Sequence, residues 1–216
     1  LSDGVSFNGK TYLASFGMGV VALDANGETI FNETNSTLEI TGPADPGGIY
    51  VTALAAGSSL WITNYGASHP VHTLSAGGFV AHSVTADPGQ YPLLATLDLL
   101  ENIWMAIDPA RGGGILYKNS QTGEERYFTN TPGFGDLPNR TINAIAADRE
   151  GYIWFGSNQG VGYFFSPEQD AVKPIFENRF LLKDEKITSI EVDAGDRKWI
   201  GTEKGITRIK LNRALE

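Results

Sequence analysis

Three histidines are the residues whose type and spacing come nearest to a chemical site. His69, His72 and His82 lie close together in the sequence, and imidazole nitrogens are common zinc ligands. His72 and His82 are expected on two adjacent strands, where they would be neighbours. A zinc site needs a third ligand at a suitable position, however, and isolated histidines on strands are more often ordinary sheet residues. We therefore predict no metal site and no cofactor.

The sequence also lacks the usual patterns of covalent catalysis and phosphate binding. It contains no cysteine, which excludes disulfides, thiolate nucleophiles and Cys-ligated metals. No Gly-x-Ser-x-Gly turn or phosphate-binding loop occurs, and the glycines of "DPARGGGILY" (108–117) precede an expected strand instead of a helix. Glu124 and Glu125 are typical of a solvated strand face. These observations predict a protein without catalytic residues.

Composition narrows the class further. A chain of 216 residues with 41% hydrophobic content can bury a core as one domain, or at most two small ones. The net charge of -9 argues against nucleic-acid binding, because no basic stripe offsets the repulsion from phosphates. No apolar run has the length of a membrane span.

One aromatic phrase returns along the chain at intervals of roughly 40–50 residues, which is the period of β-propeller blades. It contains a tryptophan in "SLWIT", "NIWMA", "YIWFG" and "RKWIG", and a tyrosine in the earliest copy, "KTYLAS". Three of the copies have an aspartate six residues before the tryptophan. The repeated aromatic residues are Tyr12, Trp61, Trp104, Trp154 and Trp199, and the aspartates are Asp98, Asp148 and Asp193.

Each repeat divides into four short apolar runs separated by turns rich in Gly, Asn and Asp. Four strands per repeat predict an all-β fold, namely a β-propeller of about five consecutive four-stranded blades. The expected blades are 1–34, 49–84, 93–130, 141–177 and 187–211. We expect residues 1–216 to form part of a larger propeller, because the last repeat stops after its third strand. A complete five-bladed ring is the alternative.

The repeated residues are interpreted as architecture. A continuous apolar run such as "YIWFG" is typical of a strand covered on both faces, and tryptophan can fill the space between neighbouring blades. Gly156 and Gly201 would give room for a close backbone approach, while Gly160 and Gly205 would open the third strand. The aspartates would accept hydrogen bonds from turn N–H groups, because "DREG" and "DAGD" supply too few oxygens for calcium.

The stretches "INAIAADREGYIWFGSNQGVGYF" and "ITSIEVDAGDRKWIGTEKGITRI" resemble the two-component-regulator propeller repeat. That repeat is common in periplasmic sensor domains of Bacteroidetes hybrid histidine kinases. Residues 131–210 further resemble the surface propellers of the type IX secretion system, which implies delivery of anionic lipopolysaccharide at the cell surface. The first two repeats depart from the pattern, since Ser6 and Ala55 stand where the aspartate is expected.

A propeller without catalytic groups most often binds a ligand at one rim of its channel. The loops between the second and third strands share a rim with the connections between blades. From the former we predict ligand contacts by Tyr65, His69, Arg111, Asn158, Gln159, Glu203 and Lys204, and from the latter by Asn139 and Arg140, with Arg179 and Lys183 beyond them. Aromatic, amide and arginine side chains are suitable for sugars or anionic glycans.

Two functions remain open after this reasoning. The first is a non-enzymatic propeller at the bacterial cell surface or in the periplasm, of the type IX secretion kind. It would bind a glycan or lipopolysaccharide-like ligand, or secretion-system surface proteins, and contact the remaining blades of its parent protein. The alternative is the oligosaccharide-binding sensor propeller of a hybrid two-component regulator. A propeller lyase or glycosidase would need a histidine or carboxylate pair converging on the channel, which the repeats do not supply.

Overall fold

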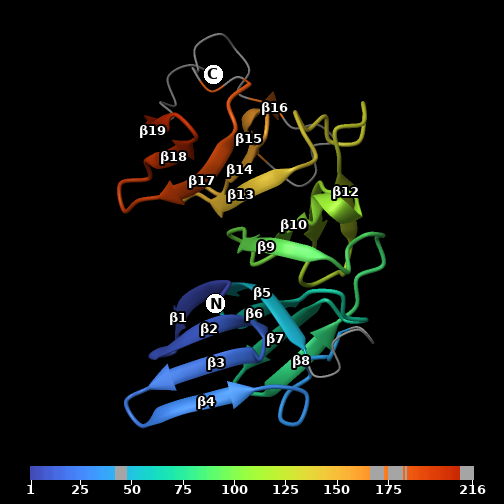
Figure 1. Ribbon diagram of the computed structural model, residues 1–216, viewed down its shortest axis with the longest axis vertical. Coiled ribbons are helices and arrows are strands. Elements are labelled where there is room, and N and C mark those ends of the chain that lie inside the picture. The colour runs from blue at the N-terminus through green and yellow to red at the C-terminus, as the bar shows by residue number, and fades with distance from the viewer. Residues whose placement is uncertain (42–47, 166–172, 175–181, 183, 210–216) are drawn as a thin grey trace.

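The computed structural model describes residues 1–41, 48–165, 173–174, 182 and 184–209. In these residues the regular elements are strands, apart from one 3-10 turn at Pro109–Arg111. Nothing in this part of the chain is a helix long and apolar enough to cross a membrane. The fold is therefore all-β, as predicted (Figure 1).

The strands follow one another as antiparallel meanders, which we call blades 1 to 5. Blade 1 contains β1 (Asp3–Phe7), β2 (Lys10–Gly17), β3 (Gly19–Asp24) and β4 (Gly27–Phe31). Blade 2 contains β5 (Ile49–Ala56), β6 (Leu60–Asn64), β7 (Val71–Ser75) and β8 (Gly78–His82). Blade 3 contains β9 (Pro92–Leu97), β10 (Ile103–Ile107), β11 (Ile115–Lys118) and β12 (Glu125–Phe128). Blade 4 contains β13 (Ile142–Ala147), β14 (Ile153–Ser157), β15 (Gly160–Phe164) and β16 (Lys173–Pro174), and blade 5 contains β17 (Ile187–Val192), β18 (Lys198–Thr202) and β19 (Gly205–Ile209).

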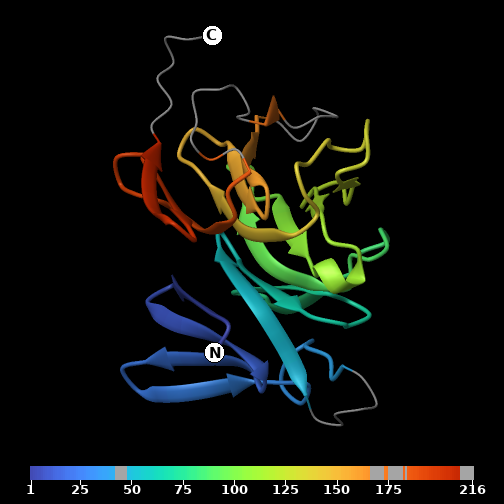
Figure 2. The same cartoon turned by 45° about the horizontal axis from the view of Figure 1, so that its top comes forward.

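The blades succeed one another along an open arc, from blade 1 in blue to blade 5 in red (Figure 2). This is the arrangement of part of a β-propeller. Blades 1 and 2 are not separate sheets, however. The end of β2 pairs with the start of β5, through Phe16 with Tyr50 and Gly17 with Ile49, so the two blades form one eight-stranded sheet. β2 is long enough to reach β5 because it extends beyond its pairing with β1.

The second strand of each blade lies at the centre of the packing. Every residue of β6, β10 and β14 is buried, because the neighbouring blades cover both faces of these strands. Trp104 and Trp154 are almost fully buried, and Trp61 and Tyr12 are also in the core. Trp199 is 39% exposed, because no described strand covers its side of blade 5.

Each of the three repeated aspartates organises the turn between the first two strands of its blade. In every case Oδ1 accepts two backbone N–H groups of the turn, and Oδ2 accepts the indole N–H of the tryptophan. The Oδ2 to Nε1 distances are 3.1 Å for Asp98 and Trp104, 2.8 Å for Asp148 and Trp154, and 2.8 Å for Asp193 and Trp199. The bond from Trp199, together with backbone and Arg197 donors, holds the pKa of Asp193 well below its usual range. The aspartate therefore joins the turn to the buried strand.

Blade 2 lacks this aspartate. The strand register shows that the residue in its place is not Ala55, as the sequence predicts. Trp61 pairs with Ala55, just as Trp154 pairs with Ala146. Ala55 therefore corresponds to Ala146, and the residue that takes the place of the aspartate is Gly57. Counting six residues back from Trp61 gives Ala55 instead of Gly57, because the turn between β5 and β6 is shorter than the corresponding turn of blade 4.

A carboxylate from blade 3 occupies the space beside Gly57. A Cβ atom built on Gly57 would lie 2.8 Å from the carboxyl carbon of Glu101. The Glu101 oxygens accept hydrogen bonds from the backbone N–H of Ser58 at 2.6 Å and from its hydroxyl at 2.5 Å. The indole nitrogen of Trp61 has no hydrogen-bond partner among the described residues. The bond that the other three tryptophans make is therefore missing in blade 2.

The repeated glycines have different local roles. A Cβ on Gly156 would lie 2.2 Å from Cγ2 of Ile187, so this glycine lets β17 of the next blade approach. A Cβ on Gly201 would lie 2.4 Å from the hydroxyl of Ser189 on the neighbouring strand. Gly160 and Gly205 begin β15 and β19 with φ values of 102° and 140°, where a side chain would be strained.

Candidate ligand-binding rim

Antiparallel meanders bring two sets of loops to the same rim. The chain turns from the second strand to the third at one end of each blade, and the fourth strand returns the chain to that end. Backbone hydrogen bonds connect these loops from blade to blade. Gly66 N–H donates to Gln90 O at 2.6 Å, Gly114 N–H to Arg140 O at 2.7 Å, and Gly160 N–H to Glu185 O at 2.8 Å. The rim is therefore continuous from blade 2 to blade 5.

Four aromatic rings gather on this rim where blades 1, 2 and 3 meet; we call Phe16, Tyr50, Tyr65 and Tyr91 the aromatic cluster. The ring centroids of Phe16 and Tyr50 are 4.3 Å apart, and those of Phe16 and Tyr65 are 6.1 Å apart. Tyr65 meets Tyr91 edge-on at 5.3 Å. Phe16 is 56% exposed, so the cluster presents an apolar surface to solvent.

Polar groups of blade 3 fix one side of the aromatic cluster. Tyr65 donates its hydroxyl to Oδ2 of Asp108 at 2.5 Å, while Oδ1 of Asp108 caps the Pro109–Arg111 turn by accepting the N–H of Ala110 at 2.8 Å. Burial and the bond to Asp108 raise the pKa of Tyr65, so its phenol stays protonated and donates. The guanidinium carbon of Arg111 lies 4.6 Å from the ring centroid of Tyr91, a cation–π distance.

Tyr65 and Arg111 are thus the two predicted rim residues that the structure brings together. His69 is close to the rim but is held by another group, because its Nδ1 lies 2.6 Å from Oε1 of Glu39. Burial acts to raise the pKa of Glu39, yet the bonds from His69 and from the N–H groups of Ser68 and His69 lower it overall. The His69 ring is therefore held by its contact with Glu39.

The predicted contacts of blades 3 to 5 continue along the same rim, away from the aromatic cluster. Arg140 donates to Asn130 Oδ1 at 2.6 Å and to Thr131 Oγ1 at 3.2 Å. Asn139 accepts the N–H of Thr141, and Asn158 accepts the side-chain amide of Asn143. Gln159 donates its backbone N–H to Ser157 Oγ, while Glu203 pairs with Lys186 and Lys204 with Glu185. Arg179 and Lys183 lie outside the described residues.

Sequence reasoning missed Phe16, Tyr50, Tyr91 and Asp108. Phe16, Tyr50 and Tyr91 lie at or next to the ends of strands in different repeats. That position at a strand end was the one sign in the sequence that they could reach the rim. An aromatic residue at a strand end is also common in a core, so only the fold shows that these rings meet.

The three histidines do not converge. Val71 pairs with His82 and His72 with Ala81, so His72 and His82 are adjacent residues on opposite faces of their sheet. His72 is buried with Nδ1 at 2.8 Å from Thr37 Oγ1, and His82 Nε2 lies 2.9 Å from Thr73 Oγ1. Among the described residues, no group of three histidines and carboxylates could hold a metal ion.

Comparison with known proteins identifies the repeat. The model of the family described as "Two component regulator propeller" matches residues 136–159, which include β13 and β14. A comparison with curated proteins finds no match.

Solved structures share the fold at low sequence identity. PorZ, a surface component of the type IX secretion system of Porphyromonas gingivalis, matches 95% of this chain with 17% identity and a TM-score of 0.73. The extracellular domain of the hybrid two component system BT3049 from B. thetaiotaomicron matches 94% with 20% identity and a TM-score of 0.66. Virginiamycin B lyase from Staphylococcus aureus matches 99% with 15% identity and a TM-score of 0.67.

This chain spans only part of those relatives, namely 31% of PorZ and 26% of the BT3049 domain. At these identities the likeness concerns the fold alone. Residues 136–159 match the two-component-regulator propeller repeat, and the chain as a whole has the fold of part of a β-propeller.

Proposed function

We propose that this chain is a non-enzymatic propeller that binds an anionic glycan, such as a lipopolysaccharide-like ligand, at the aromatic cluster. The observation that carries the proposal is the meeting of four aromatic rings with Arg111 on one rim. A ligand site needs apolar surface with a few well-placed polar groups, and this rim offers both.

Each part of the site has a distinct task in this proposal. The exposed face of Phe16 receives the apolar face of a sugar ring, and the Tyr65 phenol and Asp108 stay bonded to each other as a support. Arg111 supplies a fixed positive charge with planar donors, which suit a carboxylate or phosphate group on the glycan. Arg140 lies further along the rim, where its guanidinium donates to Asn130 and Thr131.

The biological setting is part of the same proposal. PorZ is described as a bacterial surface component of the type IX secretion system, and the BT3049 domain as extracellular. By analogy we place this chain at the bacterial cell surface or in the periplasm. Secretion-system surface proteins and the remaining blades of a parent protein are its proposed partners.

The second candidate is a sensor propeller of a hybrid two-component regulator. The match of residues 136–159 to the two-component-regulator propeller favours it. In that case the same rim would bind an oligosaccharide, and binding would rearrange a sensor dimer. A dimer that forms or reorganises on adding oligosaccharide would favour the sensor over the secretion component.

The absence of catalysis is also proposed, since a lyase shares this fold. Two described groups that could act as acid or base on the rim are already engaged. The Tyr65 phenol is held protonated beside Asp108, and His69 is paired with Glu39. Turnover of a glycan at this rim, lost on changing His69, would contradict the proposal.

The test is a calorimetric titration with trigalacturonate as an anionic glycan and maltotriose as a neutral one. Arg111→Ala is expected to weaken trigalacturonate binding about tenfold or more, the effect of one charge-assisted hydrogen bond. Arg149→Ala is the matched control, because it removes an exposed arginine from the turn at the opposite end of blade 4. Equal losses in both variants, or no binding by the unchanged protein, would refute the proposal.

A further inference from the structure

The two ends of the blade arc expose opposite faces of the same repeated sheet. Each inner blade packs with one face on the blade before it and with the other on the blade after it. No described blade precedes blade 1 or follows blade 5. The two free faces lie at opposite ends of the open arc, so they do not meet within one chain (Figures 1 and 2). The contacts repeated between the inner blades indicate what fits them.

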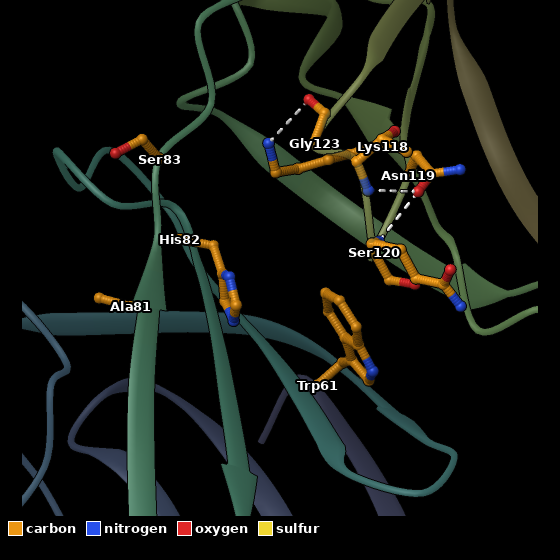
Figure 3. A pocket seen from close by; sticks show the side chains of 10 residues that line it. Trp61, Ala81, His82, Ser83, Lys118, Asn119, Ser120 and Gly123 are labelled. Atoms are coloured by element: carbon orange, nitrogen blue, oxygen red, sulfur yellow. Dashed lines mark hydrogen bonds between the residues drawn. The ribbon is translucent and has the colours of Figure 1, made fainter.

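At each inner interface the aromatic residue of one blade packs on aliphatic residues of the next. Trp154 shares a core cluster with Ile187 and Ile200, which lie on the first two strands of blade 5. Trp61 shares one with Ile103 of blade 3. Figure 3 shows this second interface, where the Trp61 ring lies below the hairpin between β11 and β12. The next blade therefore covers the aromatic ring of the blade before it.

Two kinds of hydrogen bond accompany this packing. On the rim, Gly160 donates its N–H to the carbonyl oxygen of Glu185 at 2.8 Å, two residues before blade 5 begins. In the turns at the other end, Arg149 donates its N–H to Oδ1 of Asp196 at 2.9 Å. The rim bond recurs after blades 2 and 3, and the turn bond recurs between blades 2 and 3. An inner interface thus combines an apolar cluster with hydrogen bonds at both ends of the blade.

Blade 5 presents the first half of such an interface without a cover. Trp199, unlike the equivalent tryptophans, is partly exposed. Ile206 pairs with Gly201, two residues after Trp199, so its side chain points to the same face. Ile206 is 77% exposed. This free face therefore carries the aromatic ring that a following blade would cover, together with an exposed aliphatic side chain.

Blade 1 presents the second half. Tyr12 packs toward blade 2, so the next residue, Leu13, points to the free face. At the inner interfaces the residue after the repeated aromatic one covers the preceding blade. Leu13 pairs with Val21, and Val21 with Ile30, which extends the apolar surface across the sheet. Leu23 lies on the same face, and it and Ile30 are each 36% exposed.

The hydrogen-bonding groups of an inner interface also have counterparts on the two free faces. Leu1 lies two residues before β1, the position of the carbonyl acceptor on the rim, and Gly205 begins β19 as the donor glycine begins β15. Asn8 lies in the first turn of blade 1 with a positive φ, as Asp196 does in blade 5. Its side-chain oxygen can accept the N–H of Ala194, the residue after the repeated aspartate. The free faces of blades 5 and 1 are therefore complementary.

We propose that copies of this chain associate head to tail, with the free face of blade 5 of one copy on the free face of blade 1 of another. Association buries the exposed aromatic and aliphatic side chains of both faces. Two different faces meet, so each pair keeps one free face at either end and grows into longer assemblies as the concentration rises. Neither face includes the aromatic cluster, so the proposal is independent of the glycan site.

Sedimentation equilibrium of the whole chain, from about 1 µM to about 300 µM, tests the proposal. We expect the average mass to rise from that of the monomer to at least twice that value. Ile206→Glu puts a charge on the blade 5 face, and Leu23→Glu puts one on the blade 1 face. Each is expected to weaken association about tenfold or more, because the added charge would be buried without a partner. Ile30→Glu replaces Leu23→Glu if the latter does not fold.

The matched control is Leu100→Glu. Leu100 is 73% exposed, in the turn between β9 and β10 in the middle of the arc, away from both free faces. This variant is expected to associate as the unchanged chain does.

A mixture of the two face variants distinguishes head-to-tail contact from contact between identical faces. Ile206→Glu keeps an intact blade 1 face, and Leu23→Glu keeps an intact blade 5 face. Each variant alone is expected to stay monomeric, whereas an equimolar mixture should form dimers that do not grow further.

Four results would overturn the proposal. They are a chain that stays monomeric throughout, an equal effect of Ile206→Glu and Leu100→Glu, dimers of Leu23→Glu alone, and a mixture of the two face variants without dimers. A monomeric chain would leave a further blade of a parent protein as the occupant of the blade 5 face.

Discussion

The ammonium of Lys198 in blade 5 lies 2.7 Å from Oδ2 of Asp148 in blade 4, and neither side chain is more than 1% exposed. The same ammonium contacts Asp196 Oδ2 at 2.8 Å and lies 5.3 Å from the centroid of the Trp154 ring. Burial acts to lower the pKa of Lys198, but the two carboxylates raise it above its ordinary value. The interface between blades 4 and 5 is thus built around a buried ion pair.

Lys198→Met is expected to destabilise the chain by about 3–5 kcal/mol, because Asp148 would keep its burial and lose its counter-charge. The double variant Asp148→Asn with Lys198→Met removes both charges and should recover part of this loss. Urea unfolding of the two single variants and the double variant gives the coupling energy. Additive effects would show that the pair is not coupled.

Two acidic residues with a left-handed backbone each accept a hydrogen bond from the turn of the preceding blade. Glu101 has a φ of 61° and binds Ser58, while Asp196 has a φ of 59° and accepts the N–H of Arg149 at 2.9 Å. Glu101→Gly removes backbone strain of about 1 kcal/mol but also a charged hydrogen bond worth about 1.5–3 kcal/mol, so we expect a net loss of stability.

Asn8→Gly provides the comparison for that variant. Asn8 also has a positive φ, 47°, in the turn between β1 and β2. Glycine there should leave the midpoint of thermal unfolding unchanged or raise it, whereas Glu101→Gly should lower it. If both variants raise the midpoint, the carboxylate of Glu101 does not stabilise the contact between blades 2 and 3.

Buried His72 makes stability depend on pH. Burial lowers its pKa from 6.5 to about 4, although Glu39 and the hydrogen bond with the His69 backbone act in the opposite direction. Between those two pH values the unfolded chain binds more protons than the folded chain. The stability contributed by neutral His72 is therefore complete above pH 6.5 and is lost as pH falls toward 4, by at most about 3 kcal/mol.

Denaturant unfolding at several pH values checks this dependence. His72→Asn keeps a group that can bond to Thr37 and cannot titrate, so its stability should fall less between pH 6.5 and 4. An identical decline in the variant and the unchanged chain would assign the effect to other groups.

Equivalent tryptophans should differ in their contribution to stability. Trp154 is fully buried between blades, whereas Trp199 is 39% exposed. Trp154→Ala is expected to cost about 3–5 kcal/mol through the cavity it leaves, and Trp199→Ala clearly less. A calorimetric comparison decides the point, since a fully folded Trp154→Ala chain of unchanged stability would rule out its packing role.

The repeat pattern was visible in the sequence because packing between blades demands the same residues at the same strand positions. The aspartates before Trp104, Trp154 and Trp199 could be placed in turns for that reason, although the bond to the indole could not. In blade 2 a shorter turn shifts the alignment, and only strand register identifies Gly57 as the counterpart. Counting residues back from the tryptophan identifies the counterpart of the aspartate only in blades whose turn has the same length.

The polar contacts between blades could not be predicted from the sequence. Lys198 stands where the other blades have Ile153, Ile103 or Leu60, so its position before a tryptophan predicts an apolar residue. Its burial depends on Asp148 from another repeat. In the same way, the aromatic cluster draws rings from several loops that only the folded chain brings together.

The repeated residues build the blades, and the rim between blades 1, 2 and 3 is the proposed glycan site. The most direct measurement is a map of backbone amide shifts as trigalacturonate is added to the chain. The predicted result is a set of shifts centred on Phe16, Tyr65 and Arg111, lost in Arg111→Ala. Shifts centred on the opposite turns, at residues 98–102 and 148–152, would contradict it.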